Sequence, residues 1–348
     1  MKKLLRKYVR RREPVTPSRV TNDTVAEHRE QILAGGRKFK YPIQYARHKL
    51  VINAVIVASV AAVLLLLIGW WQLYPMQNSS RMMYRLTRLV PVPVAVVNGE
   101  QVPYRDYLVQ YRASEYYLGK YGDTKLDTDD GRRQLDYIKR QSLTMAEQVA
   151  YARQLARERQ VTVSSKDVDE FIDQERNTAN GRVSQETYDA SIQMLYDQPV
   201  DDYRLTVANG ILKNKVAFAV DETAKAQVEQ AKTLLKDTNG DFAKVAEGLA
   251  NSKGGKVTVG ETGLIGNANK YGGLRVSEVS KLEKGAVSEP LMSTTADGYY
   301  FVKVIDKNDT QVNFAYIHIP LTTFTSDFAK LKEAGKINEF ISVSETKS

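Results

Sequence analysis

A run of 22 residues without a formal charge, from Leu50 to Trp71, constrains this chain more than any other feature of its sequence. As an α-helix the run would be about 33 Å long, enough to cross a hydrocarbon core of about 30 Å. Trp70 and Tyr74 lie where aromatic side chains gather at a membrane surface, and Pro75 ends the helical pattern. Because a buried core helix is rarely so uniformly apolar, we expect a single transmembrane helix over residues 50–71.

The charges on either side of this run predict its orientation. No small-residue cleavage site follows it, so an uncleaved signal anchor fits better than a secretory signal peptide. Residues 1–49 are strongly basic, whereas the arginines that follow the span weaken the asymmetry without reversing it: Arg81, Arg85 and Arg88. By the positive-inside rule, residues 1–49 form a cytoplasmic tail and the C-terminal domains are extracytoplasmic. We therefore expect a single-pass protein of the cell membrane.

The net charge of +9 belongs to the tail rather than to the whole chain. Residues 1–50 hold 14 Lys and Arg against 4 Asp and Glu, whereas the rest of the chain holds 36 basic and 37 acidic residues. We expect the tail to set topology and contact anionic lipid, and we expect no nucleic-acid partner. With no cysteine and three scattered histidines (His28, His48 and His318), we expect no metal site and no cofactor.

Beyond the span, residues 76–94 form a polar connector that ends in PVPV, where the prolines favour an extended backbone. Residues 95–213 begin with a short strand, an Asn98-Gly99 turn and a tyrosine-bearing helix, and then continue in helical periodicity. Ser164 starts one of these helices as part of a capping box. We expect a mostly helical domain here.

Residues 214–306 have the rhythm of a smaller α+β domain. Val216–Val220 predicts a strand, two amphipathic helices follow, and glycine-rich loops lead to a strand over Tyr299–Ile305. The closing segment, residues 307–348, predicts a strand over Val312–Pro320 and then an amphipathic helix. The helix would bury Phe324, Phe328, Leu331, Ile337 and Phe340. The expected fold class is therefore α+β, with one N-terminal transmembrane helix.

Several of these segments, in order, are similar to a family of chaperones. VAVVNGEQVPYRDY and AEQVAYARQLARERQVTVSSKDVDEFI resemble the SurA/PrsA-type chaperone domain. DFAKVAEGLANSKGG, GETGLIG and LEKGAVSEPLMSTTADGYYFVKV resemble a parvulin-type (PpiC) peptidyl-prolyl isomerase domain. The resemblance covers roughly residues 92–305. It implies a SurA N-like helical domain followed by a parvulin-like domain.

The parvulin resemblance implies a cleft lined by two histidines, a Cys or Asp, and an apolar pocket that grips proline. In this chain Phe218 and Tyr300 stand at the two histidine positions, and the Cys or Asp position falls near Asn251. The proline pocket falls near Tyr271 and Leu274. Most of the family's catalytic residues are therefore replaced, and the candidate peptide-binding residues are Phe218, Tyr271, Leu274 and Tyr300.

A histidine occurs where the family does not have one. AYIHIP resembles the family's first strand, but it lies after the domain instead of before it. His318 could belong to a truncated repeat, could complete the sheet out of order and enter the cleft, or could pack without a role. The candidate catalytic residues are Tyr300, His318, Ser293 and Thr294.

Eleven of the 20 tyrosines lie between Tyr104 and Tyr203, where they could pack in a core or line a groove for extended peptides. We expect a membrane-anchored extracytoplasmic chaperone or foldase. Its partners would be unfolded or nascent secreted polypeptides and the cytoplasmic membrane. Two alternatives stay open: an active prolyl isomerase with a non-standard site, and a non-catalytic interaction subunit of the cell envelope.

Overall fold

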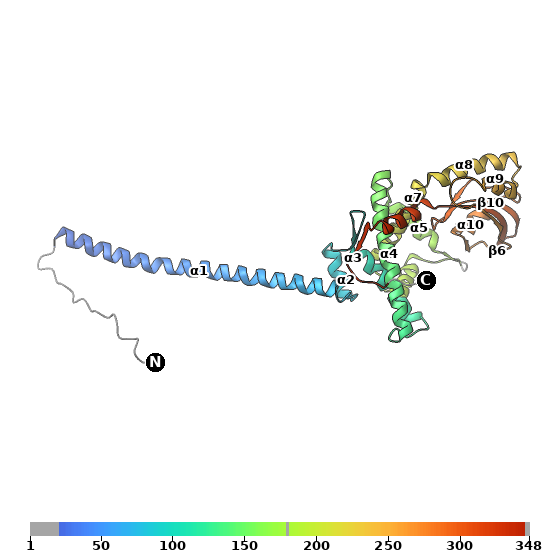
Figure 1. Cartoon of the computed structure of the whole chain (residues 1–348). Coiled ribbons are helices and arrows are strands. Elements are labelled where there is room, and N and C mark those ends of the chain that lie inside the picture. Colours follow the sequence, from blue (N-terminus) through green and yellow to red (C-terminus); the bar gives the residue numbers. More distant parts are fainter. Residues whose placement is uncertain (1–20, 179–180, 345–348) are drawn as a thin grey trace. The chain divides into compact units, whose positions relative to one another are not determined.

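The computed structural model describes residues 21–178 and 181–344, with the side chains of residues 36–47 outside the description (Figure 1). The chain splits into two compact units, residues 1–71 and 72–348. The most basic part of the expected tail, residues 1–20, lies outside the described residues.

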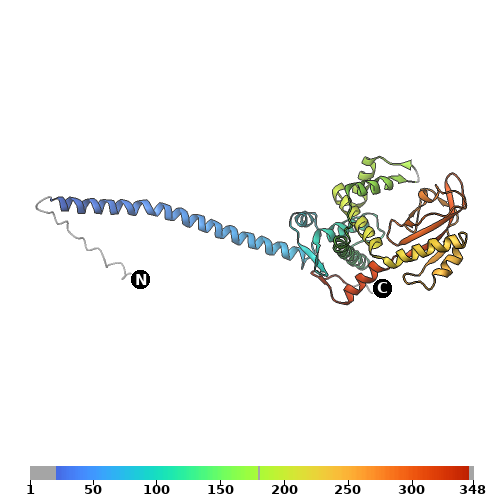
Figure 2. The same ribbon diagram turned by 90° about the horizontal axis from the view of Figure 1, so that it is seen from above.

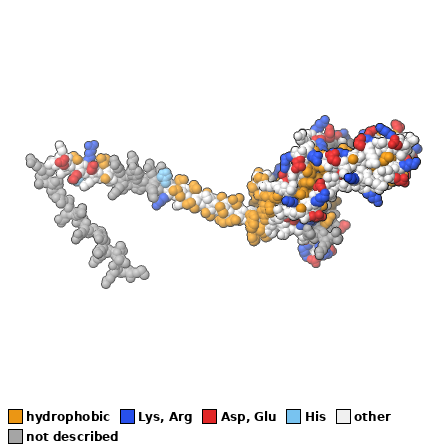
Figure 3. Space-filling view, turned by 45° about the horizontal axis from the view of Figure 1, so that its top comes forward, with side chains coloured by type: hydrophobic (Ala, Val, Ile, Leu, Met, Phe, Trp, Pro, Cys, Tyr) orange, Lys and Arg blue, Asp and Glu red, His pale blue; other side chains and the backbone are white. Residues whose placement is uncertain are grey.

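The described part of the first unit is almost entirely the long helix α1 (Asn22–Leu73), whose last two residues belong to the second unit. The sequence predicted a helix only over residues 50–71, but the structure begins it at Asn22. Residues 22–49 include several Ala, Glu, Arg and Gln, which favour the helix, although Gly35, Gly36 and Pro42 disfavour it. The part from His48 to Leu73 is long and apolar enough to cross a membrane, and Figure 3 shows hydrophobic side chains along it. This helix could therefore anchor the chain in a membrane.

The second unit opens with a small antiparallel sheet of order β12-β1-β2. Its strands are β1 (Pro93–Val97), β2 (Glu100–Pro103) and β12 (Ile337–Glu339). Asn98 and Gly99 join β1 to β2 with φ of 49° and 86°. Positive φ at both positions is typical of the tight hairpin turn that Asn-Gly favours, so the predicted turn is confirmed.

Helices pack on this sheet and on one another. The helices are α2 (Arg81–Leu89), α3 (Tyr104–Tyr121), α4 (Asp129–Arg159), α5 (Ser165–Glu175), α6 (Gln185–Tyr196) and α7 (Val200–Val220). α3 and α4 pack on the sheet, α2 and α6 pack on α3, α7 packs on α4, and α5 packs on α7. A short hairpin, β3 (Asn177–Thr178) and β4 (Gly181–Arg182), separates α5 from α6. The capping box at Ser164 is confirmed, because its hydroxyl accepts from the Asp167 N–H while the Asp167 carboxylate accepts from the Ser164 N–H.

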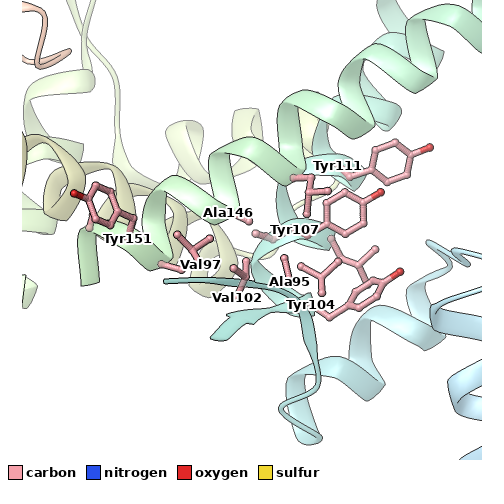
Figure 4. Packing of buried hydrophobic residues seen from close by; sticks show 14 of the residues in the cluster. Ala95, Val97, Val102, Tyr104, Tyr107, Tyr111, Ala146 and Tyr151 are labelled. Carbon is pink, nitrogen blue, oxygen red and sulfur yellow. The ribbon is translucent and has the colours of Figure 1, made fainter. Parts of the chain in front are cut away.

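Tyrosines form much of the core between sheet and helices. Figure 4 shows Tyr104, Tyr107 and Tyr111 in a row along α3, beside Ala95 and Val102 of the sheet. All five are buried, and the tyrosine rings contact one another in sequence at centroid distances of 5.6 and 5.8 Å. These three tyrosines of the eleven therefore pack in the core and do not line an open groove.

The expected connector over residues 76–94 contains a helix that the sequence analysis missed. α2 begins at its N-cap Ser80 and buries Met83, Tyr84 and Thr87 against the domain. In the PVPV segment, Pro93 and Val94 are extended as the first residues of β1, whereas the Val92 N–H donates to the Val90 carbonyl at 2.8 Å and closes a tight turn around Pro91. Residues 81–89 are therefore part of the folded domain.

A second sheet of order β5-β11-β10-β9 forms the rest of the unit, and β6 also pairs with β11. Its strands are β5 (Thr258–Glu261), β6 (Ile265–Gly266), β9 (Leu291–Met292), β10 (Gly298–Lys307) and β11 (Gln311–Pro320). The helices α8 (Glu222–Asp237) and α9 (Phe242–Leu249) pack along one face of it (Figure 2). The other face carries the hairpin β7 (Lys270–Tyr271) and β8 (Leu274–Arg275) and the short helix α10 (Val276–Val279). β11, the last of these strands in the chain, lies in the middle of the sheet.

The predicted strand over Val216–Val220 is wrong, because these residues are the last turns of α7. Val216, Ala217 and Val220 are buried in the core of the helical domain. Since adding a residue to an existing helix costs far less than starting a strand, the helix overrides their β propensity.

The C-terminal segment returns to the first sheet. α11 (Thr323–Glu333) buries Phe324 and Phe328 as predicted. Ile337 and Phe340 were expected on the same helix, but Gly335 has a positive φ of 65° that ends it, and Ile337 begins β12. Residue by residue, β12 pairs antiparallel with β1. The chain therefore closes the helical domain with its own C-terminal strand.

Candidate functional site

Two of the predicted site residues face each other on the second sheet. Tyr300 of β10 and His318 of β11 are direct partners in the antiparallel register. Their rings stack with centroids 4.5 Å apart and an angle of 21° between planes. His318 therefore lies on the same sheet face as Tyr300, which was one of the three possibilities that the sequence left open.

Asp297 joins this pair from the turn before β10. Tyr300 Oη donates to Asp297 Oδ2 at 2.8 Å, and His318 Nε2 lies 3.1 Å from the Asp297 carbonyl oxygen and 3.8 Å from Oδ2. Burial raises the pKa of the Tyr300 phenol, and the hydrogen bond to Asp297 raises it further. Tyr300 is therefore a neutral hydrogen-bond donor at physiological pH. Gly272 makes room for it, since a Cβ there would lie 2.6 Å from Tyr300 Oη.

Tyr271 and Leu274, the predicted proline-pocket residues, lie on this same face. Tyr271 Oη donates to Tyr316 Oη at 3.1 Å, and Tyr316 in turn contacts Tyr300 with ring centroids 6.1 Å apart. Leu274 is buried in the same cluster. The face thus presents a histidine and three tyrosines around an apolar base, and we call Tyr271, Tyr300, Tyr316 and His318 the aromatic face.

Phe218 does not lie on the aromatic face. It is buried on α7, and its ring meets the edge of Tyr299 at a centroid distance of 5.0 Å. Tyr299 and Tyr300 are adjacent in a strand, so they point to opposite faces of the sheet. Asn251 lies exposed in the loop after α9. The structure therefore does not bring these two residues together with Tyr300.

Ser293 and Thr294 hold the turn between β9 and β10. Ser293 is buried, and its Oγ accepts from the backbone N–H groups of Asp297 and Gly298 at 3.0 and 3.3 Å. Thr294 Oγ1 donates to the Gly273 carbonyl at 2.9 Å. With these hydroxyl groups engaged by the backbone, both residues act as supports for the turn that carries Asp297.

A cavity of about 530 Å³ lies beside this turn, between α5 and α7 of the helical domain and the β9 edge of the second sheet. Its apolar walls come from Phe171, Val207, Ile211 and the exposed Met292. Its rim carries both signs of charge, from Asp167, Glu170, Lys215 and Arg275. Three of the predicted site residues line this cavity: Phe218, Ser293 and Thr294. The sequence analysis did not connect them, because one wall comes from residues 167–218 and the other from residues 275–294.

The two walls of this cavity are joined by polar contacts. Asn214 Nδ2 donates to the Thr294 carbonyl at 2.6 Å. On the neighbouring hairpin, Lys270 and Arg275 pair with Glu175 of α5 at 2.8 and 3.3 Å. These contacts fix the width of the cavity between the helical domain and the sheet.

Asp221, another residue that the sequence analysis missed, links α7, α8 and α11. Oδ1 accepts from the Ala224 N–H at 3.0 Å and caps α8, while Oδ2 accepts from the N–H groups of Thr322 and Thr323 at 2.7 and 2.9 Å. The side chain is fully buried. Burial alone would raise the pKa of Asp221, but these hydrogen bonds outweigh it and lower the pKa below its ordinary value. Asp221 thus fixes the end of α7 to the starts of α8 and α11, and we call this set of contacts the joint at Asp221.

The fold defines an α+β protein in which a helical domain is followed by a smaller sheet domain. A family model described as the SurA-like N-terminal domain matches residues 43–217, half of the chain, and the chain belongs to this family. The match extends from the apolar part of α1 into α7, so it includes the residues that the sequence analysis assigned to a connector. No curated protein and no solved structure matches the chain. A SurA-like N-terminal domain is consistent with a chaperone role.

Proposed function

We propose that this protein is a membrane-anchored extracytoplasmic chaperone that binds unfolded polypeptides between its helical domain and its second sheet. SurA-like domains generally bind unfolded polypeptides, and the apolar part of α1 supplies a candidate anchor. The charge asymmetry around the span supports a location of the folded unit outside the cytoplasm, where secreted chains emerge unfolded.

The observation that carries this proposal is the cavity beside Met292. It combines apolar walls with a rim that carries charges of both signs. This combination suits an extended segment of variable sequence better than one fixed ligand. Met292 is 54% exposed, and an unbranched thioether adapts its shape to different side chains. Binding of this kind suppresses aggregation without nucleotide or covalent chemistry.

A second function, prolyl isomerisation, is supported by the position of β11. The parvulin resemblance implies two histidine positions, one on a first strand and one in the GYH segment. In this chain the strand that resembles the first strand comes last, yet it lies beside β10 with His318 directly opposite Tyr300. The arrangement suits a parvulin-like sheet completed out of order, in which one imidazole and one phenol replace two imidazoles.

Two assays on the full chain in nanodiscs separate these functions from the third alternative, a non-catalytic envelope subunit. Light scattering of a heat-aggregating client measures chaperone activity, and we expect suppression relative to empty nanodiscs. Refolding of a proline-limited client measures isomerase activity, and acceleration that is lost in both Tyr300→Ala and His318→Ala would support the enzyme. If neither assay responds, the envelope-subunit alternative gains and the proposed chaperone function is overturned.

A further inference from the structure

The solvent-facing side of α2 combines a stripe of arginines with exposed apolar residues. Arg81, Arg85 and Arg88 lie at spacings of four and three, so they share one side of the helix. Met82 and Leu89, seven residues apart, lie beside this stripe and are 74% and 82% exposed. Such a pattern is typical of a helix that lies in a membrane surface with its basic residues at the headgroups.

A cavity of about 450 Å³ adjoins the arginine stripe. Arg112 of α3 also lines it, and so do three carboxylates: Glu115, Asp197 and Asp202. Each carboxylate already has partners. Asp197 pairs with Arg81 at 2.7 Å, Asp202 pairs with Arg105 at 3.1 Å, and Glu115 accepts from Tyr111 Oη at 3.0 Å.

Arg85 differs from its neighbours because it makes no ion pair with any residue that the structure describes. It is exposed at the edge of this cavity. Arg81 is also largely exposed, although it pairs with Asp197. The cavity and its rim therefore retain an uncompensated positive charge that an anionic group could neutralise.

The chain itself restricts how far α2 can lie from the end of α1. Leu73, the last residue of α1, is buried in the domain, and its carbonyl accepts from Tyr104 Oη at 2.6 Å. The Asn78 N–H donates to the Gln72 carbonyl at 2.9 Å, so the chain turns back at once after the helix. α2 begins three residues later, and a membrane that α1 enters would lie within reach of it.

We propose that α2 and this adjoining cavity bind the phosphate headgroups of anionic lipid in the membrane that α1 enters, with Met82 and Leu89 in the interfacial layer. The inference rests on the membrane anchoring in the proposed function, but not on chaperone activity. It also gives a role to the arginines that follow the span. This binding would keep α2, and with it the second unit, at the membrane surface.

The absence of native cysteine permits a direct test on the full chain in vesicles. Met82→Cys carries an environment-sensitive fluorophore, and the vesicles contain a lipid with a shallow quencher. Lys281→Cys, exposed on the second sheet domain beyond α10, is the matched control. We expect quenching at position 82 in vesicles of phosphatidylcholine with phosphatidylglycerol, weaker quenching in phosphatidylcholine alone, and none at position 281.

Adding Arg85→Gln to the Met82→Cys chain tests the charge. At about 1 kcal/mol for each basic residue near an anionic surface, this change should lower the ratio of docked to undocked helix roughly fivefold. Protein that floats with the vesicles but shows no more quenching at position 82 than at 281 would overturn the inference. Quenching that is insensitive to phosphatidylglycerol and to Arg85→Gln would overturn the headgroup assignment. Protein that fails to float would instead contradict the anchoring.

Discussion

His318 lies directly opposite Tyr300 across two antiparallel strands, and their rings stack at a centroid distance of 4.5 Å. Because β11 follows the rest of its sheet in the chain, this pair exists only when the last long strand takes the central position. The aromatic face therefore depends on β11, a strand that the order of the sequence alone would place after the second domain and outside its sheet.

Tyr300→Phe keeps the stacked ring and removes the hydrogen bond to Asp297. We expect a loss of about 1 kcal/mol in the free energy of unfolding, the usual net value of one such bond. Urea unfolding followed by near-ultraviolet circular dichroism measures it. Tyr299→Phe, on the opposite face of the same strand, is the matched control. Equal stability of the wild type and Tyr300→Phe would show that the Asp297 bond contributes nothing.

Asp221→Ala removes an acceptor for backbone N–H groups of two segments at once. Loss of the α8 cap together with two part-buried N–H groups left unpaired should cost about 2 kcal/mol or more. Asp221→Asn keeps one acceptor oxygen, so its free energy of unfolding should fall less. Unfolding of Asp221→Ala within about 0.5 kcal/mol of the wild type would contradict this account of the joint.

The same carboxylate predicts a dependence on acid. A group whose pKa is lowered by folding stabilises the protein above its ordinary pKa, here 3.8, and loses this contribution as the pH falls through the native value. The stability difference between the wild type and Asp221→Asn should therefore shrink below about pH 4. If the stabilities of the wild type and Asp221→Asn fall in parallel down to the acid transition, the lowered pKa of Asp221 is contradicted.

Glu147 predicts a dependence of the opposite sign. It is buried on α4, and burial, followed by the nearby charge of Glu339, raises its pKa from 4.5 to about 8. The neutral carboxyl is thus favoured by folding, so its contribution is complete below pH 4.5 and declines as the pH rises to about 8. Because its glutamine cannot ionise, Glu147→Gln should become more stable relative to the wild type as the pH rises through this interval. We expect an advantage of about 1–3 kcal/mol near pH 9, measured by urea unfolding, and a constant difference across the interval would contradict the raised pKa.

Met292→Glu tests the cavity as the place where polypeptides bind. Because a carboxylate at this apolar wall would lose water on contact with an apolar segment, we expect client affinity to fall at least roughly tenfold. Fluorescence anisotropy of a labelled unfolded peptide reports the affinity. Lys281→Glu makes a surface charge change away from the cavity and should leave it unaltered; an equal loss in both variants would point to a general charge effect.

Local signals in the sequence predicted much of this fold. The Asn98-Gly99 turn, the capping box at Ser164 and the strands around Tyr300 and His318 all depend on neighbours within a few residues, and each is present. Segments whose secondary structure depends on packing against distant parts of the chain were harder to predict. Val216–Val220 has the composition of a strand, but the preceding turns of α7 extend through it.

The site was less predictable than the fold. A register between β10 and β11 could not be read from the sequence, so His318 remained one of several possibilities. The cavity beside Met292 combines residues 167–218 with residues 275–294, and the joint at Asp221 reaches a residue 101 positions away, so neither follows from local sequence. α2 was missed because its pattern of alternating Arg and apolar residues is short and follows a span, where a linker is the simpler expectation.

Site-specific photo-crosslinking tests the central claim most directly. A benzophenone amino acid replaces Met292 in the full chain in nanodiscs, and Lys281 in the control, and each is illuminated with one purified protein in its native and its permanently unfolded form. The account predicts crosslinks from position 292 to the unfolded form alone and few from position 281. Crosslinks of equal yield from both positions, or to native and unfolded forms alike, would contradict it.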